Sequence, residues 1–182
     1  DYGIKVTGNV IVGKLSSSYR EYIVMKSVPL KNLISVANKY SSNSYAEQIL
    51  RTVGLRVYGF GNIYNSQKVL NDFVKRLFGE YYPFKLNDAC GLSTYNLLTP
   101  YMLAQTLVYA YKNYDGFNGF ISTLATSGKE GTMEGRLKDI TAYAKTGTLQ
   151  KVSNIAGIMI TKTGKRVAFC IMVNNFITPT YI

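Results

Sequence analysis

The sequence predicts an α+β fold in which a cluster of helices lies beside an antiparallel sheet. Apolar residues recur at helical spacing through the middle of the chain, whereas short β-rich runs occur near both ends. No repeat, low-complexity tract or linker interrupts the 182 residues. With 47% hydrophobic residues, a chain of this length can bury a real core as one compact domain or as part of a larger one.

The first predicted elements are strands. In Ile4-Lys5-Val6-Thr7 apolar and polar residues alternate, and the runs 10–12 and 22–25 are rich in residues that favour strands. We expect these runs to join the sheet.

Four helices are predicted next, because apolar residues there are spaced three and four apart. The predicted stretches are 30–37, 44–53, 66–78 and 100–110. Ser44-Tyr45-Ala46-Glu47 has the spacing of a capping box, and Gly54 is expected to end that helix. Thr99 is expected to cap the fourth helix in front of Pro100.

The rest of the chain is predicted to form a loop region and then three strands. Residues 115–135 contain five glycines, which favours a short helix plus loop. Residues 141–148, 153–161 and 166–174 have strand patterns, and Lys162-Thr163-Gly164-Lys165 is a plausible hairpin turn between the last two.

Composition restricts the chemistry before any motif is considered. The chain contains no His, which excludes Ser-His-Asp triads, Cys-His pairs and His-ligated metal sites. Proton transfer must therefore use Lys, Tyr, a carboxylate, Cys or water. Cys90 and Cys170 show no metal or redox spacing, so we expect both to be free apolar residues.

The net charge of +11 comes from scarce acids rather than from a basic tail, since 21 Lys and Arg face only 10 Asp and Glu. A domain whose 16 Tyr and 8 Phe stack on nucleic-acid bases is a lesser alternative. Several of these aromatics fall on the apolar helix faces, where core packing explains them more simply. We therefore expect no nucleic-acid partner.

Two motifs carry the functional hypothesis. Ser41-Ser42-Asn43 and Lys145-Thr146-Gly147-Thr148 match the Ser-x-Asn and Lys-Thr-Gly motifs that accompany a Ser-x-x-Lys nucleophile in penicillin-interacting serine enzymes. Each motif is weak alone. The serines could merely cap a helix, and a second Lys-Thr-Gly, at 162–164, is best interpreted as a turn.

The chemistry of such a site suits a chain without His. A lysine amine can move protons if burial or nearby positive charge lowers its pKa. Gly147 would permit close approach of a substrate to the strand. Thr146 and Thr148 would offer hydroxyls to a carboxylate, and the Thr148 N–H could face an oxyanion.

Longer stretches in the same order give the motifs their context. They are 27–30, 41–47, 88–97 with Thr99-Pro100, 131–132, 136–137, 144–149, 152–153 and 156–157. Over nearly its whole length the chain resembles the C-terminal part of a D-alanyl-D-alanine carboxypeptidase/endopeptidase of the class C penicillin-binding proteins, peptidase family S13. The resemblance implies part of a transpeptidase domain like those of penicillin-binding proteins and serine β-lactamases, spanning residues 1–182.

The resemblance implies a function and a site. The family cleaves the terminal D-Ala-D-Ala bond or a cross-link of peptidoglycan through an acyl-serine, in the periplasm or cell envelope, with no metal or cofactor. Its partners would be stem peptides and β-lactams. By resemblance Ser41 and Asn43 line one wall of the cleft and Lys145 lies opposite. Thr146 and Thr148 would bind the substrate's terminal carboxylate, and Gly147 and Gln150 would lie beside it.

The chain also departs from the family pattern. It contains no Ser-x-x-Lys, so we expect a piece that begins after the nucleophile and that cannot be acylated alone. Cys90 replaces a usual serine, and Thr94 stands where many relatives carry arginine. A chain without its upstream part should expose apolar surface and a sheet edge, which would favour self-association. A non-catalytic peptidoglycan-binding or scaffold protein of the same fold is the alternative.

Overall fold

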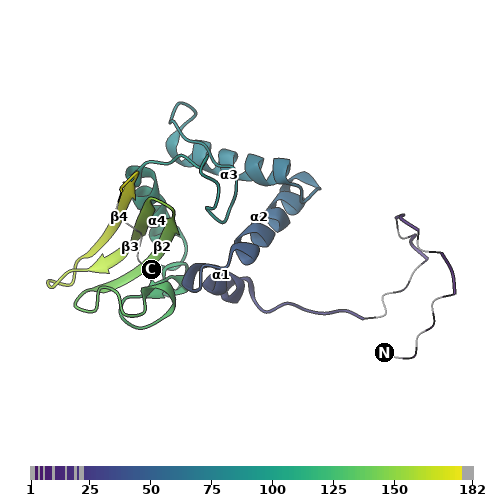
Figure 1. The fold of residues 1–182 in the computed structure, drawn as a ribbon, viewed down its shortest axis with the longest axis horizontal. Coiled ribbons are helices and arrows are strands. Elements are labelled where there is room, and N and C mark those ends of the chain that lie inside the picture. The colour runs from purple at the N-terminus through teal and green to yellow at the C-terminus, as the bar shows by residue number, and fades with distance from the viewer. Residues whose placement is uncertain are drawn as a thin grey trace.

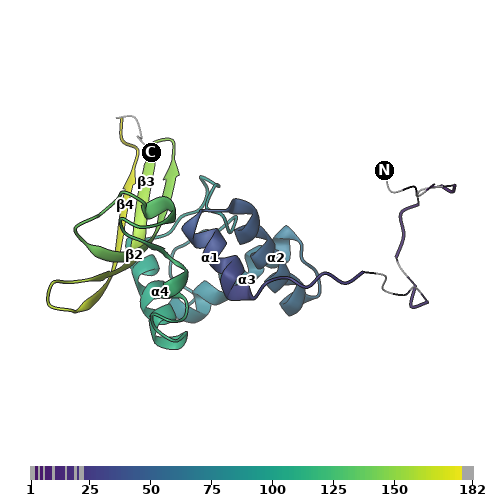
Figure 2. The ribbon, with the colours of Figure 1, turned by 90° about the horizontal axis from the view of Figure 1, so that it is seen from below.

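The computed structural model describes residues 3, 5, 7–9, 11–14, 16–18, 20 and 23–177, and it has the predicted α+β architecture. A four-stranded antiparallel sheet lies on one side and three helices gather on the other, with a fourth helix against the sheet (Figures 1 and 2). The helices are α1 (Leu30–Lys39), α2 (Asn43–Tyr58), α3 (Ile63–Phe78) and α4 (Pro100–Asn113). No helix in the described part of the chain is both long and apolar enough to span a membrane.

The sheet has the strand order β1-β2-β3-β4, so each strand lies beside its neighbour in sequence. The strands are β1 (Ala125–Thr126), β2 (Thr141–Leu149), β3 (Val152–Ile160) and β4 (Arg166–Asn174). In this register Lys145 of β2 lies opposite Ala156 of β3. The predicted hairpin turn joins β3 to β4, with the Gly164 N–H donating to the Thr161 carbonyl. The glycine-rich region folds into short 3-10 turns, η1 (Ile121–Thr123) and η2 (Gly131–Met133), on either side of β1.

Alternation along the strands divides the core between the two faces of the sheet. On one face, Leu107 of α4, Ile121, Leu124 and Ile158 form a buried cluster, so α4 and η1 cover that face. On the other face, Ala125, Met133 and Ala144 pack together beneath η2.

The second face is covered only in part. Val167, Ile171 and Val173 are between 41% and 57% exposed. Ile171 and Val173 line an apolar groove of about 550 Å³ with Leu137 and Ile140. Strand β4 has a hydrogen-bonded neighbour on one side only among the described residues. Exposed apolar surface and a sheet edge are therefore present, whereas self-association through them stays a prediction.

The expectation of N-terminal strands is wrong for the residues that can be judged. Residues 11–14 and 23–29 form no strand, and 23–29 lead away from α1 as an arm (Figure 1). Val12 and Met25 are fully or almost fully exposed. A β-rich run needs a partner strand, and these residues pair with none in the described structure. Ile4, Val6, Val10 and Tyr22 of the predicted runs lie outside the described residues.

The helix ends correct two further predictions. Ser44 is not an N-cap, because α2 already begins at Asn43 after Ser42. Gly54 does not end α2, which continues to Tyr58 and stops at Gly59 in the left-handed conformation. Gly54 is instead buried where α3 crosses α2. A Cβ at Gly54 would lie 3.2 Å from the backbone nitrogen of Ser66.

Candidate active site

The turn between α1 and α2 meets the middle of β2 through two side chains. Lys145 Nζ donates a hydrogen bond of 2.8 Å to Ser41 Oγ, and a second of 2.6 Å to the carbonyl of Thr146. The fold thus brings together residues of the two motifs that sequence analysis singled out. Ser41 has φ of 56°, the left-handed region that a residue with a Cβ seldom adopts.

The environment of Lys145 makes its amine easier to deprotonate than that of an exposed lysine. Its side chain is half-buried, and burial lowers the pKa of the amine below its ordinary value. A lysine in this state loses and regains a proton more readily than an exposed one. The Ser41 hydroxyl lies at the distance over which such a proton could pass.

The neighbouring serines and Asn43 do not act as a side-chain cap. Ser42 occupies the N-cap position in an extended conformation, and its side chain makes no capping hydrogen bond. Asn43, the first residue of α2, is exposed. The cluster therefore presents polar side chains at the start of α2 rather than using them to close the helix.

The rest of the second motif follows the strand. Thr146 is buried, at 8% exposure, Thr148 is half-buried, and Gln150 is exposed in the turn after β2. Gly147 is exposed, and a Cβ there would meet no atom within 4 Å. Alternation places Lys145 and Gly147 on one face of β2 and the two threonines on the other. Their roles toward a substrate stay predictions.

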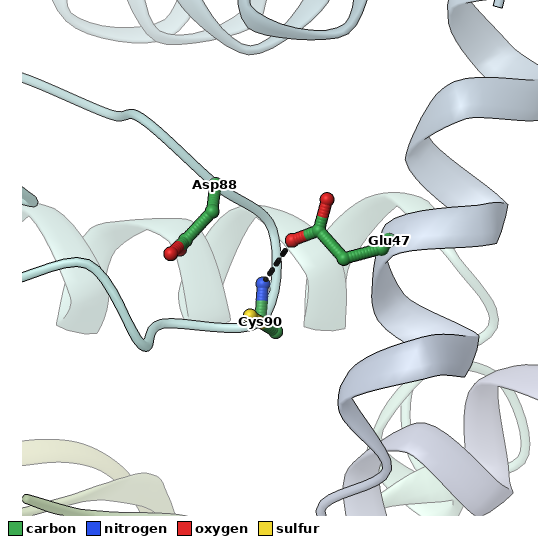
Figure 3. Close-up of side chains that lie close together, drawn as sticks. All are labelled: Glu47, Asp88 and Cys90. Carbon is green, nitrogen blue, oxygen red and sulfur yellow. Dashed lines mark hydrogen bonds between the residues drawn. The ribbon is translucent and has the colours of Figure 1, made fainter. Parts of the chain in front are cut away.

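Sequence analysis missed how Glu47 is used. This residue lies one turn after Asn43 in α2, and its Oε1 accepts a hydrogen bond of 2.8 Å from the backbone N–H of Ala89. The same oxygen accepts a second bond, of 3.0 Å, from the backbone N–H of Cys90 (Figure 3). The bonds fasten the loop that follows α3 to the start of α2. Nothing in a single sequence distinguishes this use of a glutamate from a capping box, because the partners lie more than 40 residues away.

The fastened loop is closed internally by Asp88. Its carboxylate accepts from the N–H groups of Gly91 and Ser93 and from the Asn96 side chain, at 2.8, 2.6 and 2.7 Å. Figure 3 shows this carboxylate turned away from Glu47. Asp88 therefore fixes the internal conformation of the loop, and Glu47 fixes the position of the loop against α2.

Glu47, Asp88 and Cys90 are also the residues of the described chain that could together offer ligands to a metal ion, with ligand atoms within 4.8 Å of one another. Both carboxylates already accept several N–H groups. Burial, the largest of several influences, raises the pKa of the Cys90 thiol, which disfavours the thiolate that metals bind. Together these features favour a structural role, in which the two carboxylates hold the loop in place, over metal binding.

Comparison with known families accounts for this combination of motifs and fold. The model of the D-Ala-D-Ala carboxypeptidase 3 (S13) family matches residues 1–180. The chain belongs to this family. The S13 resemblance predicted from the ordered motifs is thereby confirmed.

Two curated relatives are similar over 97% of this chain. One is the D-alanyl-D-alanine carboxypeptidase DacB of Haemophilus influenzae, at 28% identity, of which the match covers 38%. The other is the D-alanyl-D-alanine carboxypeptidase of Actinomadura sp. (strain R39), at 25% identity and 35% coverage. The chain thus spans little more than a third of the length of these relatives.

Solved structures confirm the fold class. Penicillin-binding protein 4 of Haemophilus influenzae, at 28% identity, superposes with a TM-score of 0.73 over 82% of this chain and 34% of its own. The TLA-1 β-lactamase, at 18% identity, superposes with a TM-score of 0.56 over 79% of this chain and 55% of its own. The S13 chain therefore has an α+β fold similar to part of these proteins.

Proposed function

We propose that the protein containing this chain is a serine-type D-Ala-D-Ala carboxypeptidase or endopeptidase that acts on peptidoglycan stem peptides in the periplasm or cell envelope. Residues 1–182 would form the C-terminal part of its catalytic domain. The observation that carries the proposal is the 2.8 Å contact between Lys145 Nζ and Ser41 Oγ, within a chain of the S13 family. The relatives are named as D-alanyl-D-alanine carboxypeptidases, which supports this substrate class.

In the proposed reaction, a serine outside these 182 residues attacks the carbonyl carbon of the penultimate D-Ala, and its hydroxyl proton passes to the lysine amine of the same external Ser-x-x-Lys motif. The peptide C–N bond breaks, and the leaving amine needs a proton. The Ser41 hydroxyl gives that proton and recovers one from Lys145, whose lowered pKa makes the transfer accessible. Water then attacks the acyl-serine and gives a proton through Ser41 to Lys145, while the departing serine oxygen recovers its proton from the external lysine, so that the free enzyme is restored.

The strand beside Lys145 supports the binding part of the proposal. The open space in front of Gly147 would let a peptide lie along β2. Thr148 and Thr146 would hold the terminal carboxylate, and Asn43 and Gln150 would lie at the sides of the cleft. The same groups would receive a β-lactam, which carries a carboxylate beside its reactive carbonyl.

The isolated chain is proposed to be unreactive because it contains no Ser-x-x-Lys. Intact-mass spectrometry after incubation with penicillin tests this on the full-length protein and on the isolated chain. We expect one drug mass on the full-length protein, at a serine outside residues 1–182, and none on the isolated chain. Acylation of the isolated chain would refute the external nucleophile. A full-length protein that never reacts would instead favour the non-catalytic scaffold.

Two lysine substitutions sharpen the test, because this chain contains two Lys-Thr-Gly sequences. Lys145→Met in the full-length protein should slow acylation by about a hundredfold, as expected when a proton-transfer group is removed. Lys162→Met removes the matching lysine from the exposed β3–β4 turn and should leave the rate unchanged. Equal effects of the two substitutions would exclude a specific role for Lys145.

A further inference from the structure

The end of α1 is fixed to the sheet by an ion pair that lies two residues before Ser41. Lys39 Nζ lies 2.9 Å from one carboxylate oxygen of Glu130 and 3.1 Å from the other. The first oxygen also accepts a hydrogen bond of 3.0 Å from Thr126 Oγ1 in strand β1. Glu130 therefore joins the last residue of α1 to the short edge strand.

That edge strand leads directly to the other half of the candidate active site. Ala125 and Thr126 pair with Ala144 and Tyr143 of β2, immediately before Lys145. A continuous set of contacts thus runs from Lys39 through Glu130 and β1 to the residues beside Lys145. These contacts connect the Ser41 turn to Lys145, and the Ser41 hydroxyl and the Lys145 amine must lie together.

Backbone packing also fixes the end of α1 against the segments on either side of β1. The carbonyl of Lys39 lies against Gly131, where an added Cβ would be 2.1 Å from the carbonyl oxygen and where φ is +57°. Asn38 adds a hydrogen bond of 2.9 Å to Thr123 of η1. The final turn of α1 is therefore held from both sides just before the chain reaches Ser41.

Ser41 needs such support because of its backbone conformation. Its left-handed φ costs about 1–2 kcal/mol for a residue with a Cβ, and it persists only when the surroundings fix it. In the described structure, the other ion pair, Lys75–Glu80, is longer, at 3.8 Å, and more exposed. The hydrogen bond from Lys39, the largest influence, lowers the pKa of Glu130, so this carboxylate is charged at neutral pH.

We propose that Glu130 is a positioning residue that, through Lys39, holds the strained Ser41 turn so that the serine hydroxyl meets the Lys145 amine. The inference rests on the proposed function and deepens it. Glu130 touches no substrate. Its effect would pass through the position of Ser41, so it should appear in the covalent step rather than in the initial binding of a β-lactam.

The test compares Glu130→Gln with Glu80→Gln in the full-length protein. Rapid-mixing kinetics with penicillin separate the dissociation constant of the initial complex from the acylation rate constant. For Glu130→Gln we expect the acylation rate constant to fall about tenfold or more, as for small misplacements of catalytic groups, with the dissociation constant unchanged. Glu80→Gln should change neither. Unchanged acylation in Glu130→Gln, or an equal loss in both variants, would overturn the proposal.

Two further measurements separate positioning from folding and from the proposed function. The exchanged pair Lys39→Glu/Glu130→Lys should recover most of the acylation rate, whereas a failure of rescue in a folded double variant would count against the ion pair. The NMR signals of the Lys145 side chain should shift in Glu130→Gln and not in Glu80→Gln. This second measurement tests the positioning even if wild-type protein is never acylated, an outcome that would refute only the proposed function. Unshifted signals would refute the positioning.

Discussion

The amine of Lys145 and the hydroxyl of Ser41 lie 2.8 Å apart although 104 positions separate them in the sequence. Each partner occupies an environment that costs stability. Ser41 has a left-handed backbone, and the Lys145 amine is partly withdrawn from water. Strain of this kind is typical of functional sites, because the rest of the fold must hold the groups in place. Substitutions that remove the buried amine or the steric cost of the positive φ should therefore stabilise the fold.

Lys145→Met should change how stability depends on pH. Because burial lowers the pKa of Lys145 in the folded protein, the unfolded chain binds more protons between that lowered value and the ordinary 10.5. The free energy of unfolding of the wild type should therefore rise with pH in this window, by at most about 1.4 kcal/mol per pH unit. The Met variant should lack this rise. Its gain in stability over the wild type should therefore be greatest near neutral pH.

Urea unfolding at several pH values between neutrality and pH 10.5 would measure the difference. Lys162→Met, in the exposed turn, is the matched control and should keep the wild-type slope. Parallel curves for Lys145→Met and the wild type would show that the amine is not withdrawn from water as described.

Ser41→Gly and Ser41→Ala should differ in stability although both remove the hydroxyl. Glycine adopts a φ of 56° without the steric cost that alanine retains. We expect the Gly variant to be about 1 kcal/mol more stable than the Ala variant. Thermal or denaturant unfolding of the pair gives the answer, and both variants should lose penicillin acylation. An Ala variant as stable as the Gly variant would mean that the turn is not strained.

Sequence patterns were informative where structure is local. Helical spacing located α1, α3 and α4, and the hairpin turn at Gly164 and the cap at Thr99 form as predicted. The Lys145 and Ser41 motifs were also found, but only because the order of motifs along the chain matched a family. The spacing of residues within each motif does not reveal that Lys145 and Ser41 meet in the fold, and it does not reveal the positive φ of Ser41.

Residues whose role depends on distant partners were misjudged. Glu47 has the spacing of a capping box yet binds the loop at Ala89 and Cys90. Glycine often ends a helix, but Gly54 lies inside α2, at the point where α3 packs closely against it. Residues 11–12 and 23–25 favour strands by composition but pair with no strand in the described structure, and a strand needs a neighbour. In each case tertiary contacts decided the outcome.

Glu47→Ala should loosen the loop against α2. The substitution leaves the N–H groups of Ala89 and Cys90 without their charged acceptor, at an expected cost of about 2–3 kcal/mol. Amide hydrogen exchange at Ala89 and Cys90 should accelerate, which is the local signature of the lost bonds. Glu134→Ala, at an exposed position, is the control and should change neither quantity. Unaltered exchange would show that the loop is held by other contacts.

Gly54→Leu should separate α2 from α3. Even a Cβ at this position would lie 3.2 Å from the Ser66 nitrogen, so a larger side chain must push the helices apart. We expect a loss of about 1–3 kcal/mol in the free energy of unfolding, the usual cost of overpacking. Arg56→Leu, on the exposed side of α2, should cost far less. Comparable losses would mean that the leucine, rather than the crossing, causes the effect.

Gly147→Ala and Gly157→Ala place the same methyl group on neighbouring strands with opposite expected results. At Gly157 the added Cβ would lie 2.2 Å from the Tyr143 carbonyl oxygen, so we expect a loss of stability of about 3 kcal/mol. At Gly147 it meets nothing within 4 Å, so stability should hold or rise slightly.

In the full-length protein, Gly147→Ala should lower the rate of acylation although it leaves stability intact. If a substrate lies along β2, the new methyl group occupies the space that its backbone needs, and acylation by penicillin should fall about tenfold or more. Calorimetry and acylation kinetics on the same sample separate the two effects. A stable Gly147→Ala protein that acylates at the wild-type rate would place the substrate elsewhere. The open space in front of Gly147 would then be no more than exposed surface.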